Sequence, residues 1–329
     1  MRKIVILLMC TILFGVLSVF AWGFWAHQRI NRMACFTLPP DMIGFYKKNI
    51  DFIEAHAVDP DMRRNAVPEE APRHYIDVDH YGAHAFDSLP VYWKDAVQKY
   101  SEDTLNEYGI VPWYIVHMLY RLTDAFREKN QDRILYYSAN IGHYIADAHV
   151  PLHCTENYNG QLTNQVGIHG FWESRLPELL GDQYDFFTGR AVYISEPQEE
   201  TWKIVKASFA ALDSVLYFEK ELSKKFDTDL KYAFEQRGNK MVKVYSKEFS
   251  EAYHTMLSGM VERRMQAAIF SVGSFWYTAW VNAGSPDLSH LGNKEASDSL
   301  KVKLKQEEEL WKKGKVKGSH GHENSETGD

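Results

Sequence analysis

The chain has 329 residues, enough for one large or two small domains, and 45% of them are hydrophobic. Its formal net charge is −7 at pH 7, and an acidic chain gains little from neutralising phosphates, so broad binding to duplex DNA is disfavoured. Three cysteines are too few for a disulfide-rich scaffold.

Residues 1–21 have the pattern of a cleavable export signal. Two basic residues precede an apolar run at 4–20, and the sequence at 19–21 fits the cleavage site of such signals. The apolar run is at the short limit for a membrane-spanning helix. We therefore expect a secreted or periplasmic protein that has no transmembrane anchor after cleavage and begins at Trp22.

Cleavage would change the chemistry of the new N-terminus. Trp22 would gain a free α-amino group, whose ordinary pKa is about 7.7. Once deprotonated, this nitrogen can bind a metal ion, and His27 follows five residues later. The aromatic start is also typical of an apolar anchor, so the signal is weak alone. Cys35 and Cys154 would be the remaining cysteines; an exported compartment allows them to pair, but the sequence leaves open whether they meet.

A helix is expected at 41–50, and the segment 54–82 that follows is dense in proline, aspartate and histidine. This composition favours turns and irregular backbone, in which ligands can converge without helical spacing. We interpret His56, His80 and His84 as parts of polar surface turns. The candidate functional residues of the segment are Asp59, Asp61, His74, Tyr75 and Asp77.

From residue 89 onward the apolar spacing predicts helices and no strand. Their aromatic stripes are typical of a packed core, and we interpret His117 and His254 as structural. The expected domain is all-α and covers 22–290, and a polar tail at 291–329 is expected to be disordered or loosely helical. The expected helices cover 112–129, 131–149, about 172–180, 197–224 and 247–282.

The most informative stretch is 142–173, which contains two pairs of metal-ligand residue types. His143 and Asp147 are four residues apart, as are His169 and Glu173, and residues at this spacing share one helix face. Pro151 disfavours helix at the residue before it, so His153 should leave the first helix. Imidazole and carboxylate are zinc-type ligands. Together these residues predict a metal cluster.

In this order the motifs resemble the superfamily that joins bacterial zinc-dependent phospholipases C with fungal and plant single-strand-specific nucleases. The resemblance covers residues 22 to about 173 and implies an all-α fold around a trinuclear zinc cluster. The motifs on which the resemblance rests are Trp22 followed by His27, His74-Tyr75-Ile76-Asp77, His143-x-x-x-Asp147 with His153 six residues later, and His169-x-x-x-Glu173.

The resemblance also implies how the ligands divide among three Zn²⁺ ions, with Asp147 bridging two of them. The early aspartate stays open: Asp59 lies fifteen residues before His74, as in the nucleases, whereas Asp61 is followed three residues later by Arg64. The implied sets are His74, His143, Asp147 and Asp59 or Asp61 for one ion; His153, His169 and Glu173 for the second; and Trp22, through its amino nitrogen and carbonyl, with His27 for the third.

The activity that the resemblance implies is hydrolysis of phosphate esters by a metal-bound hydroxide, since clustered metals activate water and clamp phosphate. Asp59 or Asp61 would orient or deprotonate that water, and Tyr75 and Asp77 would contact substrate.

The branch of the superfamily decides the substrate. Glu173 as the last ligand resembles the phospholipases, whereas Tyr75 resembles the aromatic residue that stacks a base in the nucleases. Because the acidic charge counts against long nucleic acids, we favour a phospholipase C acting on phospholipid head groups. The alternatives are a single-strand-specific nuclease or 3'-nucleotidase, and a non-catalytic zinc-binding helical protein. The sequence leaves the oligomeric state open.

Overall fold

The structure, a computed structural model, describes residues 23–64, 66–237, 240–291 and 297–313. The predicted export signal, Trp22 and the end of the predicted tail lie outside these residues. Helices dominate the described chain, so the prediction of an all-α fold is confirmed. The helices are α1 (Gly23–Ala34), α2 (Pro40–Lys48), α3 (Ile50–Ala55), α4 (Asp59–Arg64), α5 (Ala85–Ser88), α6 (Trp93–Tyr100), α7 (Glu102–Tyr108), α8 (Val111–Arg127), α9 (Gln131–Ala148), α10 (Leu176–Leu180), α11 (Pro197–Lys225), α12 (Thr228–Lys231), α13 (Lys247–Met256), α14 (Met260–Asn282) and α15 (Asp298–Lys313).

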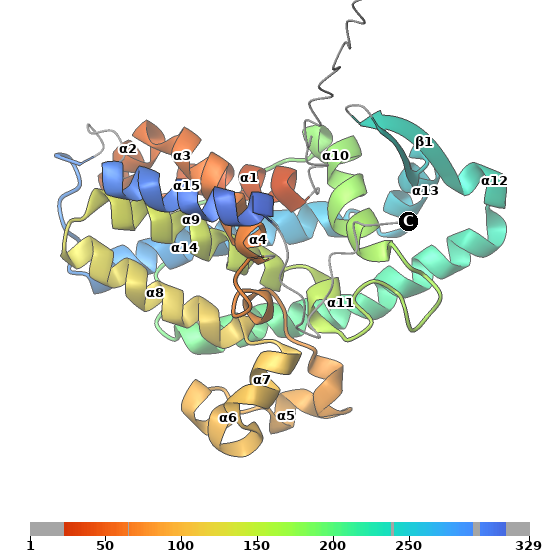
Figure 1. The fold of residues 1–329 in the computed structure, drawn as a ribbon, viewed down its shortest axis with the longest axis horizontal. Coiled ribbons are helices and arrows are strands. Elements are labelled where there is room, and N and C mark those ends of the chain that lie inside the picture. The colour runs from red at the N-terminus through yellow and green to blue at the C-terminus, as the bar shows by residue number, and fades with distance from the viewer. Residues whose placement is uncertain (1–22, 65, 238–239, 292–296, 314–329) are drawn as a thin grey trace, which may run out of the picture.

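Helix α9 lies at the centre of the fold and packs against α1, α3, α8 and α14 (Figure 1). Its N-terminus is capped by Asn130, whose side chain accepts a hydrogen bond from the backbone N–H of Arg133. It ends before Pro151, and Val150 is extended, as the proline requires. Every residue from Ser138 to Ala148 is buried. Polar side chains on this half of α9 therefore lie inside the protein.

Helix α1 approaches α9 closely at Gly142. A Cβ atom at this position would lie 2.0 Å from Oδ1 of Asn31, so only glycine fits there. The Asn31 amide also donates to the carbonyl of Ala139 at 3.0 Å. These contacts fix the start of the chain against the central helix.

Cys35 and Cys154 are both buried and are not bonded to each other. The Cys35 thiol instead contacts the carbonyl oxygen of Asn31 at 3.5 Å. The pairing that the sequence left open is therefore not formed in this structure.

Strands β1 (Tyr232–Arg237) and β2 (Lys240–Tyr245) form an antiparallel hairpin. The expectation of no strand after residue 89 is therefore wrong. A short isolated hairpin has little stability of its own, and the local sequence gives little sign of this one because tertiary contacts hold it. The ring of Tyr245 stacks on Phe171, with centroids 3.8 Å apart.

The single helix expected at 247–282 is divided into α13 and α14. Ser258 and Gly259 at the break have φ angles of 51° and 75°, in the left-handed region that interrupts a helix. The apolar spacing continues across the break, which explains why periodicity alone does not reveal it.

The expected polar tail contains helix α15, which packs along α4 (Figure 1). Residues 298–313 are thus helical, one of the two forms expected for the tail. Glu307 on this helix accepts a hydrogen bond from Arg63 of α4 at 3.0 Å. Composition could not reveal this contact because its partner is 244 residues away.

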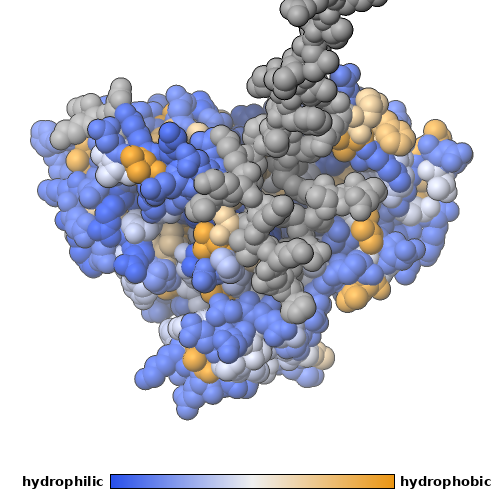
Figure 2. All heavy atoms as spheres, in the orientation of Figure 1, coloured by the Kyte–Doolittle hydropathy of each residue, from blue (hydrophilic) through white to orange (hydrophobic). Residues whose placement is uncertain are grey.

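Figure 2 shows a face that is mostly hydrophilic, with small scattered apolar patches. Over the described parts of the chain, no helix combines the length and the apolar character needed to cross a bilayer.

Candidate metal centre

The central helix supplies the first two candidate ligands. His143 and Asp147 are buried on one face of α9, with His143 Nε2 3.2 Å from Asp147 Oδ2. The other ring nitrogen of His143, Nδ1, is 2.8 Å from the carbonyl oxygen of Ala57. A hydrogen bond to that carbonyl orients the ring and leaves Nε2 as the atom available to a metal.

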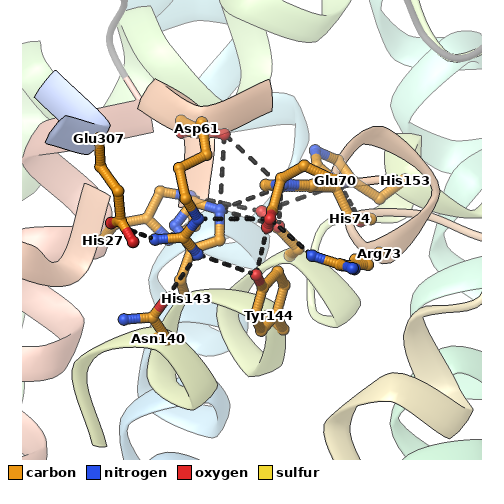
Figure 3. A network of polar contacts seen from close by, with 12 residues as sticks. His27, Asp61, Glu70, Arg73, His74, Asn140, His143, Tyr144, His153 and Glu307 are labelled. Carbon is orange, nitrogen blue, oxygen red and sulfur yellow. Dashed lines mark hydrogen bonds and ion pairs between the residues drawn. The ribbon is translucent and has the colours of Figure 1, made fainter. Parts of the chain in front are cut away.

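His74 and Asp61 complete a group around this pair. His74 Nδ1 lies 2.9 Å from Asp147 Oδ2 and 3.1 Å from His143 Nε2. Asp61 Oδ1 lies 3.4 Å from His143 Nε2 and 3.6 Å from His74 Nδ1. Helix α4, the segment at His74 and the central helix thus bring four candidate ligands to one point, and Figure 3 labels three of them, Asp61, His74 and His143.

Helix α1 brings His27 to the same place. Its ring stacks on that of His143 with centroids 3.9 Å apart, and its Nε2 is 3.3 Å from Asp147 Oδ1. His27 lies in the second turn of α1, whose first residue in the described chain is Gly23. The residue before Gly23 is Trp22, whose predicted role as a ligand lies outside the described residues.

The second group consists of His153, His169 and Glu173. Glu173 Oε2 is 3.2 Å from His153 Nε2 and 3.2 Å from His169 Nε2. His153 leaves α9 through the turn at Pro151, as predicted, and its Nδ1 faces the carbonyl oxygen of His74 at 2.7 Å. Glu173 stands on a π-helical turn at Gly170–Arg175 rather than on the expected α-helix.

Asp147 lies between the two groups. Its Oδ2 faces His74 and His143, while its Oδ1 is 3.3 Å from His27 Nε2 and 3.8 Å from His153 Nδ1. A carboxylate with one oxygen on each side can serve two ions at once. This position suits the bridging role that the family resemblance implies.

The two early aspartates differ in their surroundings. Asp61 points toward His143 and His74, whereas Asp59 Oδ2 is 2.9 Å from His56 Nδ1. Both stand on the single turn of α4, so their spacing to His74 in sequence could not decide which one faces the ligands. The structure brings Asp61, and not Asp59, into the cluster.

Tyr75 and Asp77 are not presented to solvent. Tyr75 is 1% exposed, and its hydroxyl donates to the carbonyl of Glu107 at 3.0 Å. A ring held in the core offers no face on which a substrate can stack. Asp77 is also buried, and burial, followed by the nearby charges of Asp79 and Glu156, raises its pKa to about 8.

The histidines interpreted as surface-turn or structural residues lie outside the cluster. His80 stacks on Tyr108 with centroids 3.2 Å apart, and the side chain of His84 is 87% exposed. His117 is exposed and His254 is half-buried, and desolvation of each ring lowers its pKa.

The chemistry of the buried groups fits zinc. Nδ1 of His169 and Nδ1 of His27 are buried and have no hydrogen-bond partner among the described residues. Burial would raise the pKa of Asp61, but the neighbouring imidazoles, His143 first, lower it to about 2. Burial would lower the pKa of His153, but Asp147 and Glu173 raise it to about 9. Ionised carboxylates at such sites need cations beside them, either protons on the imidazoles or metal ions.

The profile of the zinc-dependent phospholipase C family matches residues 26–236. The chain belongs to this family. The match includes every candidate ligand from His27 to Glu173, so the predicted superfamily is confirmed. Comparison with curated proteins gave no match. Members of the family are zinc-dependent phosphoesterases, and the family assignment makes this chain a zinc phosphoesterase. Its buried histidine, aspartate and glutamate groups suit zinc binding.

Sequence reasoning missed the residues behind the ligands. Glu70, Arg63, Arg73 and Tyr144 form a buried polar network next to His74 (Figure 3). The one available signal was the spacing of Glu70 four residues before His74. Arg63 and Tyr144 could not be joined to that pair from local spacing, since they come from α4 and α9.

Proposed function

We propose that the protein is an exported zinc-dependent phospholipase C that hydrolyses the phosphodiester bond to the head group of phospholipids. The observation that carries the proposal is the convergence on Asp147 of two groups of buried ligands, within a chain that belongs to this family. Bound zinc would supply a Lewis acid and an activated water at the phosphorus atom.

The proposed ligand sets follow the distances in the structure. Asp61, His74, His143 and Asp147 would hold one ion. The second ion would be held by His153, His169 and Glu173. For the third ion, His27 would act with the amino nitrogen and carbonyl of Trp22, and Asp147 would serve two of the ions.

Asp61 also has a suitable place for assisting the reaction. Its side chain is 27% exposed, whereas that of Asp147 is 2% exposed. A carboxylate that touches the ligands and also meets solvent can accept a proton from the attacking water. We assign this role to Asp61 and not to Asp59.

Two observations count against a nucleic acid as substrate. Tyr75, the residue expected to stack a base, is packed in the core. In addition, the formal net charge of −7 at pH 7 disfavours binding of a polyanion.

The deciding experiment offers the mature, zinc-loaded protein phosphatidylcholine vesicles and single-stranded DNA separately. We expect release of phosphocholine and diacylglycerol, with no shortening of the DNA. Nucleotide release without lipid hydrolysis would assign the protein to the nuclease branch. Bound zinc with no turnover of either substrate would make it a non-catalytic zinc protein.

A further inference from the structure

Helix α15, which lies beyond the matched family region, contacts the helix that carries Asp61. Glu307 Oε2 accepts from Arg63 Nη1 at 3.0 Å, and Glu307 Oε1 accepts from the hydroxyl of Tyr136 at 3.1 Å. Lys303, one turn earlier on α15, lies over the ring of Tyr136, with Nζ 3.6 Å from the centroid. Side chains at two successive turns of α15 thus fix it against the helical body.

The partner of Glu307 continues the contact inward. Arg63 is buried and also reaches Glu70, with Nε 3.3 Å from Oε2. Arg73 donates to the same Glu70 oxygen at 2.8 Å, and Tyr144 donates to the other. Glu70 is 1% exposed, so these partners, and not water, orient its carboxylate.

Glu70 in turn stands directly behind His74. Its Oε1 is 3.6 Å from His74 Nε2, and that nitrogen is buried with no hydrogen-bond partner within the described part of the chain. The other nitrogen of His74 faces Asp147 at 2.9 Å. Figure 3 shows Glu307, Glu70 and His74 within one network of polar contacts. A carboxylate behind a metal-ligating histidine fixes the ring and raises its basicity.

We propose that Glu307 is a positioning residue for the metal centre, acting on His74 through Arg63 and Glu70. Arg63 is held between two carboxylates, Glu70 inside and Glu307 outside, and it also donates to Asn140 Oδ1 and to the Tyr144 hydroxyl. If the outer charge is removed, Arg63 becomes a buried cation with one carboxylate that it must share with Arg73, and leaving a buried charge without its partner is costly. Arg63 would then shift, and Glu70 would follow it away from His74. The proposal rests on the proposed role of His74 as a zinc ligand.

The test compares Glu307→Gln with Glu309→Gln in the full mature chain. Both substitutions remove one negative charge from α15, but Glu309 is exposed. Zinc affinity is measured by competition with a chelator. Outer-shell partners typically change metal affinity about 10- to 100-fold, and Glu307 acts two steps farther out, through Arg63 and Glu70. We therefore expect Glu307→Gln to lower the affinity for the most weakly held zinc ion about 5-fold. Glu70→Gln should lower this affinity about 10-fold or more. Glu309→Gln should leave it unchanged.

Two further readouts separate positioning from general stability. The visible spectrum of the Co²⁺-loaded protein should change in Glu307→Gln and stay unchanged in Glu309→Gln, because it reports the geometry of the ligands. Glu307→Asp, which keeps the charge, should restore part of the zinc affinity. Equal zinc affinity and equal Co²⁺ spectra in Glu307→Gln and the unmodified protein would overturn the proposal. The proposal would also be overturned if Glu307→Gln lost the same thermal stability in its metal-free and zinc-loaded forms and its Co²⁺ spectrum did not change. If the unmodified protein itself bound no zinc, the proposed function would fail instead.

Discussion

The ring of His27 stacks on that of His143, with centroids 3.9 Å apart and planes inclined by 22°. The stack joins the first described helix to the central one at the position of the candidate ligands. It depends on Gly142, the neighbour of His143, because Asn31 of α1 occupies the space where a Cβ atom would lie. The packing of the Asn31 side chain on Gly142 therefore helps to set the distance between the two histidines.

Gly142→Ala should push α1 away from α9 and weaken zinc binding at His27. The added methyl group would lie 2.0 Å from Asn31 Oδ1, and overpacking of this kind costs about 1–3 kcal/mol of folding stability. Thermal unfolding and zinc titration measure the two effects. Gly44→Ala is the matched control, because that helical glycine has no heavy atom within 4 Å of an added Cβ. Unchanged stability and zinc binding in Gly142→Ala would contradict the close approach of α1.

The three aspartates should respond differently to replacement by asparagine. Asp147→Asn should release more than one ion and abolish hydrolysis, because its two oxygens face different histidines. Asp61→Asn should lower zinc affinity and reduce hydrolysis about 100-fold or more. Asp59→Asn should retain zinc, since its partner is His56. Zinc content by elemental analysis and initial hydrolysis rates give the comparison. A greater loss in Asp59→Asn than in Asp61→Asn would reverse the assignment.

The mature N-terminus offers a test that involves no side-chain change. An amide nitrogen is delocalised into the peptide bond and is a poor metal ligand, whereas the free amine of Trp22 can donate once deprotonated. Protein made with an extra methionine before Trp22 should therefore bind one zinc fewer than the authentic form and hydrolyse substrate slowly, with the same helical content. Circular dichroism and zinc analysis of the two forms check this. Equal zinc content and turnover would remove Trp22 from the ligand set.

Asp77 should make the protein less stable as the pH rises. Its pKa is raised from 3.8 to about 8 in the folded protein, chiefly by burial. Between these values the folded carboxyl keeps a proton that the unfolded chain has lost. The contribution of Asp77 to the free energy of unfolding is therefore most favourable below about pH 4. It declines toward pH 8 by at most about 1.4 kcal/mol per pH unit. Asp77→Asn should flatten this decline in denaturant titrations at several pH values. Asp87→Asn, at an exposed side chain, should not.

Local spacing was sufficient to pair candidate ligands that share a helix face, such as His143 with Asp147. Local spacing failed where the assignment depends on the direction in which a side chain points. Asp59 and Asp61 are two residues apart on α4, and only the folded structure shows that one faces His143 and the other His56. Tyr75 has the sequence position of a stacking residue, yet the core encloses it. Glu307 was beyond reach because its partner lies near the other end of the chain.

The π-helical turn at Gly170–Arg175 makes this part of the centre sensitive to chain length more than to residue identity. It carries Glu173 on one side, and at its end Arg175 bonds to Glu235 and to the carbonyl of Tyr245 in the hairpin. A π-turn corresponds to an α-helix with one inserted residue. Deleting one residue would restore α-helical geometry within the turn and change the directions of the side chains that stand on it. The Glu173 carboxylate, which faces His153 and His169, and the Arg175 guanidinium, which bonds to the hairpin, would be redirected together. Insertions and deletions here should therefore be tolerated far less than substitutions.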